Sequence, residues 1–296
     1  MRKNILFFLL LFPLFSIAQT DFSDRWEDFY SYNNVKDFIK IDNTIYAISD
    51  NAVFIYNTTT KEVQKLSSVK GFSGEITSAI HYNSSTKRLI IGYENGLIEV
   101  FDEDGSITIS ADIVNFNQSG EKSINHISEH NNKLYISTPF AIVVYDIEKL
   151  EFGDTYFIGA SSSSVKINET VFLNNQIYAA TENGVFVADI RNTNLIDFNN
   201  WNLLFLGNFK SITEFNTSIY TSKADELFRI DGANLILEKN LTEPIIRLKS
   251  SSEYLSVALQ KSAIVYTTSL TTVAQSTVTT TYNYNCRITI EVDDQD

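Results

Sequence analysis

The amino-acid sequence predicts an all-β chain folded as a β-propeller of six four-stranded blades. Two observations lead to this prediction. In every repeat, short polar turns connect strand-like segments in which apolar residues alternate with polar ones. This is the pattern of antiparallel hairpins. The alternating segment also recurs at separations of 44, 45, 43, 42 and 36 residues, starting at Ile45, Leu89, Leu134, Ile177, Ile219 and Leu255. A period of about 40 to 45 residues is typical of propeller blades.

Each repeat carries the signals of four strands. In the second and fourth repeats the central pair of strands surrounds Asn95-Gly96 and Asn183-Gly184, and Asn-Gly favours hairpin turns with positive φ angles. One more strand is expected before the central pair, as at residues 35–41, 76–82, 124–130 and 211–215. A second turn is expected after the third strand, as at residues 58–61, 102–105, 146–149 and 231–232.

The sequence leaves the closure of the ring open between two alternatives. The repeats occupy residues 35–270, and the tail 271–296 continues with alternating apolar residues from Val273 to Val292. This tail is either a closing strand of a six-bladed ring or part of an incomplete seventh blade. In the second case an unpaired blade edge would make the chain self-associate.

The first 18 residues are predicted to be a secretory signal peptide. Arg2 and Lys3 precede an apolar run at 5–17, and the small residues Ser16 and Ala18 favour cleavage before Gln19. The run is too short for a stable membrane helix, and no later segment is apolar enough for one. We therefore expect an exported protein whose propeller domain covers residues 19–296, located in the periplasm or at the cell surface and peripheral to the outer membrane.

The composition argues against nucleic acid as a partner. The chain has 23 Lys and Arg against 36 Asp and Glu, a net charge of −13, whereas phosphate backbones attract clustered basic residues. Its single cysteine, Cys286, allows no intrachain disulfide. No histidine is near it in the sequence, so a packed or surplus thiol is expected rather than a nucleophile.

No motif predicts catalysis, a cofactor or a metal. Asp102-Glu103-Asp104-Gly105 resembles the start of a calcium loop but lacks the distal Glu, so a hairpin turn is expected there. His126 and His130 are four apart in a strand pattern, which separates them by roughly 13 Å, too far for one zinc ion. His81 is likewise expected on a strand. The predicted protein is therefore not an enzyme, and its partner-binding residues are not identified.

Several segments resemble the N-terminal propeller of PorZ proteins of the type IX secretion system. They lie in the same order and spacing over most of the chain, at residues 70–76, 91–98, 124–126, 134–138, 150–159, 178–184 and 194–197, and at Trp201. The resemblance implies a non-catalytic scaffold of the attachment complex, with other type IX proteins as partners and a link to the delivery of anionic lipopolysaccharide to a sortase. The second propeller and C-terminal β-sandwich of that family do not follow before Asp296, so the resemblance implies a shortened chain.

Two other functions remain open on the sequence alone. The repeats also resemble the propellers in the sensor regions of two-component regulators, so a periplasmic sensor domain is one alternative. A hydrolase or lyase on a propeller scaffold is the other, because any blade can supply the two carboxylates that glycoside hydrolysis needs.

Overall fold

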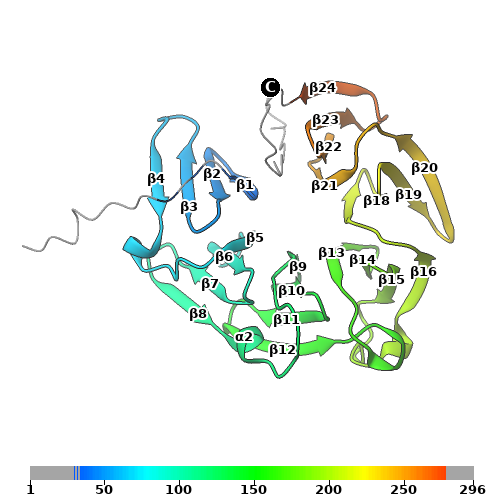
Figure 1. Cartoon of the computed structure of the whole chain (residues 1–296), viewed down its shortest axis with the longest axis horizontal. Coiled ribbons are helices and arrows are strands. Elements are labelled where there is room, and N and C mark those ends of the chain that lie inside the picture. The colour runs from blue at the N-terminus through cyan, green and yellow to red at the C-terminus, as the bar shows by residue number, and fades with distance from the viewer. Residues whose placement is uncertain (1–29, 31, 33, 278–296) are drawn as a thin grey trace, which may run out of the picture.

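The computed structural model describes residues 30, 32 and 34–277, and it confirms the predicted six-bladed propeller. Six four-stranded antiparallel sheets are arranged as a ring around a common axis (Figure 1). Within each sheet the strands follow one another in chain order. The first strand of each blade lies next to the axis and the fourth at the rim, so residues of six first strands converge on the centre.

The first three blades have these strands in chain order. Blade 1 contains β1 (Asp37–Ile41), β2 (Thr44–Ile48), β3 (Val53–Asn57) and β4 (Val63–Leu66). Blade 2 contains β5 (Thr77–Asn83), β6 (Arg88–Tyr93), β7 (Ile98–Phe101) and β8 (Ile107–Ser110). Blade 3 contains β9 (His126–His130), β10 (Lys133–Ser137), β11 (Ile142–Asp146) and β12 (Glu151–Tyr156).

The last three blades repeat this arrangement. Blade 4 contains β13 (Ile167–Leu173), β14 (Gln176–Thr181), β15 (Gly184–Asp189) and β16 (Asn202–Leu206). Blade 5 contains β17 (Ser211–Phe215), β18 (Ser218–Lys223), β19 (Glu226–Asp231) and β20 (Asn234–Asn240). Blade 6 contains β21 (Ile245–Ser250), β22 (Tyr254–Leu259), β23 (Ser262–Thr267) and β24 (Thr272–Thr277).

Helical structure in the described residues is confined to single turns in the connections. These are η3 (Ser68–Lys70), α2 (Asp112–Asn115), η4 (Ala160–Ser162) and η5 (Phe198–Asn200). The predicted first strands at 35–41, 76–82, 124–130 and 211–215 all exist, as β1, β5, β9 and β17, and each begins within two residues of the expected position. The four predicted turns after the third strands are also present.

The two Asn-Gly dipeptides lie in the predicted hairpins between the second and third strands, but only the one in blade 2 has the predicted positive φ. Of Asn95-Gly96 only Gly96 has a positive φ, at 92°, and Gly184 begins β15 with an ordinary φ. The hydroxyl of Thr181 organises that turn, because it accepts bonds from the amides of Asn183 and Gly184 and donates to the Gly184 carbonyl. Consecutive positive φ angles occur instead in the first hairpins of blades 3, 4 and 5, at Asn131-Asn132, Asn174-Asn175 and Asn216-Thr217.

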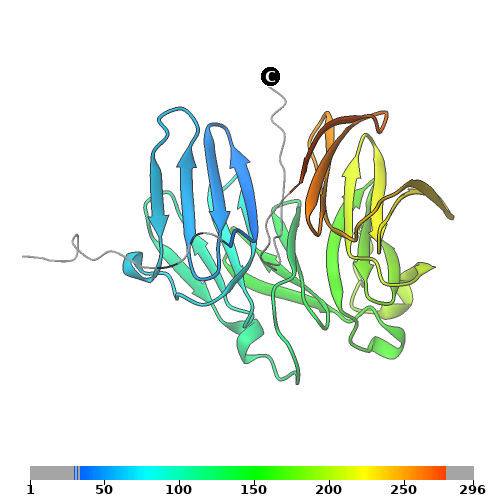
Figure 2. The same cartoon turned by 45° about the horizontal axis from the view of Figure 1, so that its top comes forward.

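Apolar clusters join successive blades. The junction of blades 2 and 3, for example, buries Ile90 and Ile98 against Leu134 and Tyr145. Equivalent clusters lie between blades 1 and 2, 3 and 4, 4 and 5, and 5 and 6. Among the residues described, no such cluster joins blade 6 back to blade 1. Figure 2 shows the sheets of these two blades standing upright beside each other.

Some predictions fall on the chain termini. The first residues of the tail, Thr272–Thr277, are the outermost strand of blade 6. The remainder of the tail, Cys286 and the predicted signal peptide lie outside the described residues. Within the described part of the chain, no helix has the length and apolar character needed to span a membrane.

Candidate binding site in the central channel

One side chain from each inner strand contributes to a layer across the centre of the ring. In five blades the contributing residue lies eight positions before the start of the sequence repeat, and in blade 2 the register of β5 places Ala79 there. We call this set the channel layer: Asp37, Ala79, His126, Glu169, Ser211 and Arg247. Two carboxylates, one guanidinium group, one imidazole ring and one hydroxyl group thus meet where the six blades converge.

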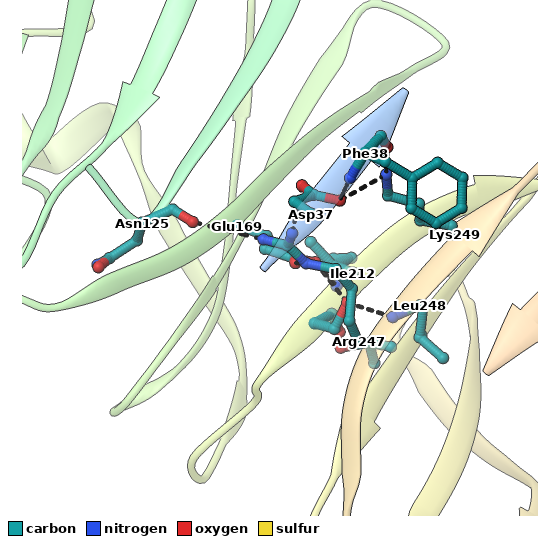
Figure 3. A network of polar contacts seen from close by, with 10 residues as sticks. Asp37, Phe38, Asn125, Glu169, Ile212, Arg247, Leu248 and Lys249 are labelled. Carbon is teal, nitrogen blue, oxygen red and sulfur yellow. Dashed lines mark hydrogen bonds and ion pairs between the residues drawn. The ribbon is translucent and has the colours of Figure 1, made fainter. Parts of the chain in front are cut away.

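Arg247 of β21 holds the channel layer together (Figure 3). Its Nη1 atom lies 2.5 Å from Oδ2 of Asp37, and its Nε atom lies 3.0 Å from Oε1 of Glu169. The side chains of Asp37 and Glu169 are 7% and 6% exposed, so the ion pairs are almost dry. Since Asp37 belongs to blade 1 and Glu169 to blade 4, one guanidinium connects three blades.

The remaining oxygens of both carboxylates are also bound. The Ser211 hydroxyl donates to Glu169 Oε2, and the amide of Ile212 donates to the same oxygen over 2.9 Å. Oδ1 of Asp37 lies 2.7 Å from Lys249 Nζ and accepts from the amide of Phe38 over 2.8 Å. Buried ions are tolerated when hydrogen bonds satisfy them in this way.

The charges of the layer set its titration behaviour. Burial raises the pKa of Asp37, but Lys249 and Arg247 together outweigh it and hold that pKa at about 2. For Glu169 burial dominates over the attraction of Arg247, and its pKa is raised. Burial, followed by the positive charge of Arg247, lowers the pKa of His126 to about 3. At neutral pH His126 is therefore uncharged, and its Nδ1 atom is buried without a hydrogen-bond partner.

The channel layer separates two cavities at opposite ends of the channel. Residues from the channel layer onward along the inner strands line a cavity of about 400 Å³, whereas residues at or before the layer, with residues at the ends of second strands, line one of about 940 Å³. Arg247 and Glu169 contribute to both linings, so they form the partition. A ligand entering at one end therefore meets a floor whose buried charged groups are already paired with one another.

The smaller cavity is lined by hydroxyl groups and by a histidine–carboxylate pair. His81 Nε2 lies 2.8 Å from Glu129 Oε2, and Asn83 donates to the other oxygen of Glu129 over 2.8 Å. The hydrogen bond from His81, with a smaller contribution from Asn83, lowers the pKa of Glu129 despite burial. His130 instead stacks on Phe172, with ring centroids 4.8 Å apart.

The larger cavity has a basic side. Lys166, Lys210 and Lys223 line it together with Glu94, Glu121 and Glu169, and among the described residues none of these three ammonium groups has an ion-pair partner. Lys36 also lines this cavity, but its ammonium group is paired with Glu94 at 2.9 Å. The channel thus presents different chemistry at its two ends.

Most of this arrangement could not be identified by sequence motifs. The three histidines occupy strands as predicted, at β5 and β9, but His126 and His130 have separate environments. Asp102 is the first residue of the predicted turn, and its carboxylate accepts from Arg88 Nε over 2.8 Å. Among the described residues, no group of three or more His, Cys, Asp or Glu side chains is placed to bind a metal ion.

Comparison with known proteins gives a family and a fold. The model of the family described as the PorZ N-terminal beta-propeller domain of the type IX secretion system matches residues 45–202. A solved structure of PorZ from Porphyromonas gingivalis, described as an essential bacterial surface component of that system, superposes with a TM-score of 0.70 at 18% identity. The match covers 83% of this chain and 33% of that one, so this chain spans about a third of its length. No curated protein matches by sequence.

Proposed function

The chain belongs to the family of PorZ N-terminal β-propeller domains of the type IX secretion system, and from this premise we propose that it is a non-catalytic binding scaffold of the type IX attachment complex. The family match is the observation on which the proposal rests. It covers residues 45–202, and thus includes three members of the channel layer, Ala79, His126 and Glu169.

The channel layer supports a scaffold rather than an enzyme. Arg247 binds both buried carboxylates, and hydrogen bonds occupy their remaining oxygens. Groups that satisfy one another in this way stiffen the centre of the ring, whereas a general acid or base needs a carboxylate that can reach a substrate proton. Binding would then use the loops and cavities at the two ends of the channel, where propellers present their variable residues.

The proposal includes location and partners. We propose that the protein is exported and acts at the outer membrane or the cell surface, in contact with other type IX attachment proteins and with anionic lipopolysaccharide. The surface location of the PorZ protein from P. gingivalis supports this placement.

A deletion in the source bacterium tests the proposal. We expect loss of type IX cargo from the cell surface, recovery by the intact gene, and copurification of other type IX components with a tagged chain. Immunoblotting of the same eluate for lipopolysaccharide tests the lipid part separately. Normal cargo display in the deletion strain, together with no type IX protein in the eluate, would refute the scaffold role.

A further inference from the structure

The fourth strand of each blade leaves one of its two edges without a neighbouring strand in the described structure. An open edge attracts other strands, and natural sheets protect it with bulges or with charged side chains. The strands β12, β16, β20 and β24 pair with the third strand of their blade through a register shift, whereas β4 and β8 pair without one. The regular outer edges are therefore those of blades 1 and 2.

Of the six outer strands described, β8 is the one that has neither a bulge nor a charged side chain. Lys65 lies in the regular strand β4, and the uncharged strands β16 and β24 are bulged. Both features occur in β12 and β20, which are bulged and carry charged residues. The sequence of β8 is Ile107-Thr108-Ile109-Ser110, in regular register with β7. Its outer edge is therefore open to another strand.

The side chain of Ile109 adds an apolar contact to this open edge. It is 54% exposed, and β8 forms the outer rim of blade 2 (Figure 1). When a peptide adds to a sheet edge, backbone hydrogen bonds supply affinity and alternate side chains supply selectivity. Since β8 has four residues, it offers few backbone bonds, and an apolar residue opposite Ile109 has to contribute to binding.

Carboxylates lie at both ends of β8 and restrict the choice of partner. Asp104 precedes the strand in the turn from β7, and Asp112 follows it at the start of α2. Both are exposed, and neither has an ion-pair partner among the described residues. If a second copy paired antiparallel about the centre of β8, its Asp104 would lie beside Asp112, and like charges destabilise such a pair. A different chain with basic residues at both ends fits the edge better.

The cations around β8 do not neutralise these two carboxylates by direct ion pairs. Most of them are held by other groups, and one is exposed on η3. They are Lys87, which pairs with Glu103, Arg88, which pairs with Asp102, Lys122, which donates to the carbonyls of Val114 and Phe116, and the exposed Lys70. The two ends of the strand thus remain available to basic residues of a partner.

We propose that the open edge of β8 is a docking site for an extended segment of another protein, with alternating apolar residues at its centre and Lys or Arg at both ends. The segment adds to blade 2 as a fifth strand, with an apolar side chain against Ile109 and its basic ends near Asp104 and Asp112. This inference goes beyond the proposed scaffold role, because it concerns the rim of the ring and does not depend on the family match.

Fluorescence anisotropy with a labelled peptide, Lys-Thr-Val-Thr-Val-Thr-Lys, tests the docking site. We expect the intact exported chain to bind it below about 1 mM, and amide hydrogen exchange to slow in β8 but in no other outer strand. Two control peptides should bind at least about tenfold more weakly. One has Glu at both ends, and the other is N-methylated at every central residue, so that it cannot donate backbone hydrogen bonds.

Variants of the protein test the edge from the other side. Ile109→Lys places a protective charge on β8 and should weaken binding by about tenfold. Leu237→Lys is the matched control, because Leu237 is 50% exposed on the bulged outer strand β20, and binding should stay within about twofold. Asp104→Asn/Asp112→Asn should weaken binding by about fivefold and reduce its dependence on salt. Circular dichroism and the unfolding midpoint establish that each variant is folded.

The outcomes distinguish this docking site from the scaffold role. Unchanged exchange in β8 at about 1 mM peptide, or equal binding of the N-methylated peptide, would overturn strand addition. Tighter binding of the peptide with Glu ends would overturn the basic partner. A dimer of the intact chain in sedimentation that Ile109→Lys dissociates would show that a second copy occupies the edge instead. Each of these results leaves the cargo display and copurification experiments to decide the scaffold role separately.

Discussion

Lys249 in the last blade and Asp37 in the first blade form an ion pair, with 2.7 Å between Nζ and Oδ1. The same ammonium group donates to the carbonyl of Phe38 and lies 5.1 Å from the centroid of the Phe38 ring. Together with the bond from Arg247 to Asp37, these contacts join the two ends of the ring. Each blade is built from consecutive strands, so within the described residues no blade shares strands from both ends of the chain. Side chains therefore have a large part in closing this junction.

Substitution of Asp37 should weaken the closure of the ring. Asp37→Asn leaves Lys249 and Arg247 with one carboxylate fewer, and breaking a buried ion pair costs about 3–5 kcal/mol. We expect the free energy of unfolding, measured by chemical denaturation, to fall by that amount. Amide hydrogen exchange should rise first in β1 and β21.

The control for this variant is Asp231→Asn, because the carboxylate of Asp231 is exposed and lies 3.9 Å from Arg229. Its effect should stay below about 1 kcal/mol, as for other surface pairs. A double-mutant cycle with Lys249→Met measures the pairwise coupling. Zero coupling between Asp37 and Lys249 would contradict their role in joining the blades.

The buried His126 should make the fold sensitive to mild acid. Its pKa is about 3 in the folded chain against an ordinary value of 6.5. Between these two pH values the unfolded chain therefore binds more protons than the folded chain does. Stability is therefore complete above pH 6.5 and decreases as the pH falls through this window. At pH 5 the loss from this one group is about 2 kcal/mol.

Chemical denaturation at pH 7.5 and pH 5.0 tests this expectation. His126→Gln should reduce the difference in unfolding free energy between the two conditions by about 2 kcal/mol. His130→Gln is the matched control on the same strand, and the contribution of His126 should persist in it. An unchanged pH dependence in His126→Gln would show that this histidine does not titrate in the window.

Two glycines in β-strands should respond differently to a methyl group. A Cβ atom at Gly184 would lie 2.3 Å from the carbonyl oxygen of Phe205 and 2.4 Å from Leu203 Cδ1, whereas at Gly153 the nearest atom is 3.6 Å away. Gly184→Ala should thus cost about 1–3 kcal/mol by forcing β15 and β16 apart. Gly153→Ala should change the stability by less than about 1 kcal/mol in either direction. Thermal unfolding of both variants measures this difference. Equal losses of stability in the two variants would contradict the steric explanation.

The blades could be predicted from the sequence because their signals are local. Alternation and turn residues recur within each repeat, and the period near 43 residues gives the number of blades. The hydrogen bonds within the turns were harder to predict from the sequence. In blade 4, for example, Thr181 rather than Asn183-Gly184 organises the turn. A hydroxyl two or three residues before a turn amide is a weaker signal than Asn-Gly.

The channel layer could not be predicted in the same way because its contacts join distant residues. Asp37 and Arg247 are 210 positions apart, and their pairing depends on how the ring closes. One signal was nevertheless present, since Asp37, Glu169 and Arg247 all lie eight residues before the start of their repeats.

The connection between blades 1 and 2 depends on Glu99, a completely buried residue of β7. Its carboxylate accepts a bond from the amide of Ser73 over 2.7 Å and another from the hydroxyl of Tyr93. Burial, followed by the adjacent Glu99, raises the pKa of Tyr93, so this tyrosine keeps its proton. Glu99 thus anchors the segment 70–76, one of those that resemble the PorZ family.

Glu99→Gln should release this segment. Since the carboxamide has one acceptor oxygen, it cannot accept both bonds with separate oxygens, and its NH₂ group would face a donor. We expect the unfolding free energy to fall by about 1–3 kcal/mol and the Ser73 amide to lose protection from hydrogen exchange. Glu75→Gln, an exposed glutamate of the same segment, is the control and should change neither quantity appreciably. If the Ser73 amide remains as protected in Glu99→Gln as in the unmodified chain, then the turn at residues 71–74 holds the segment without Glu99.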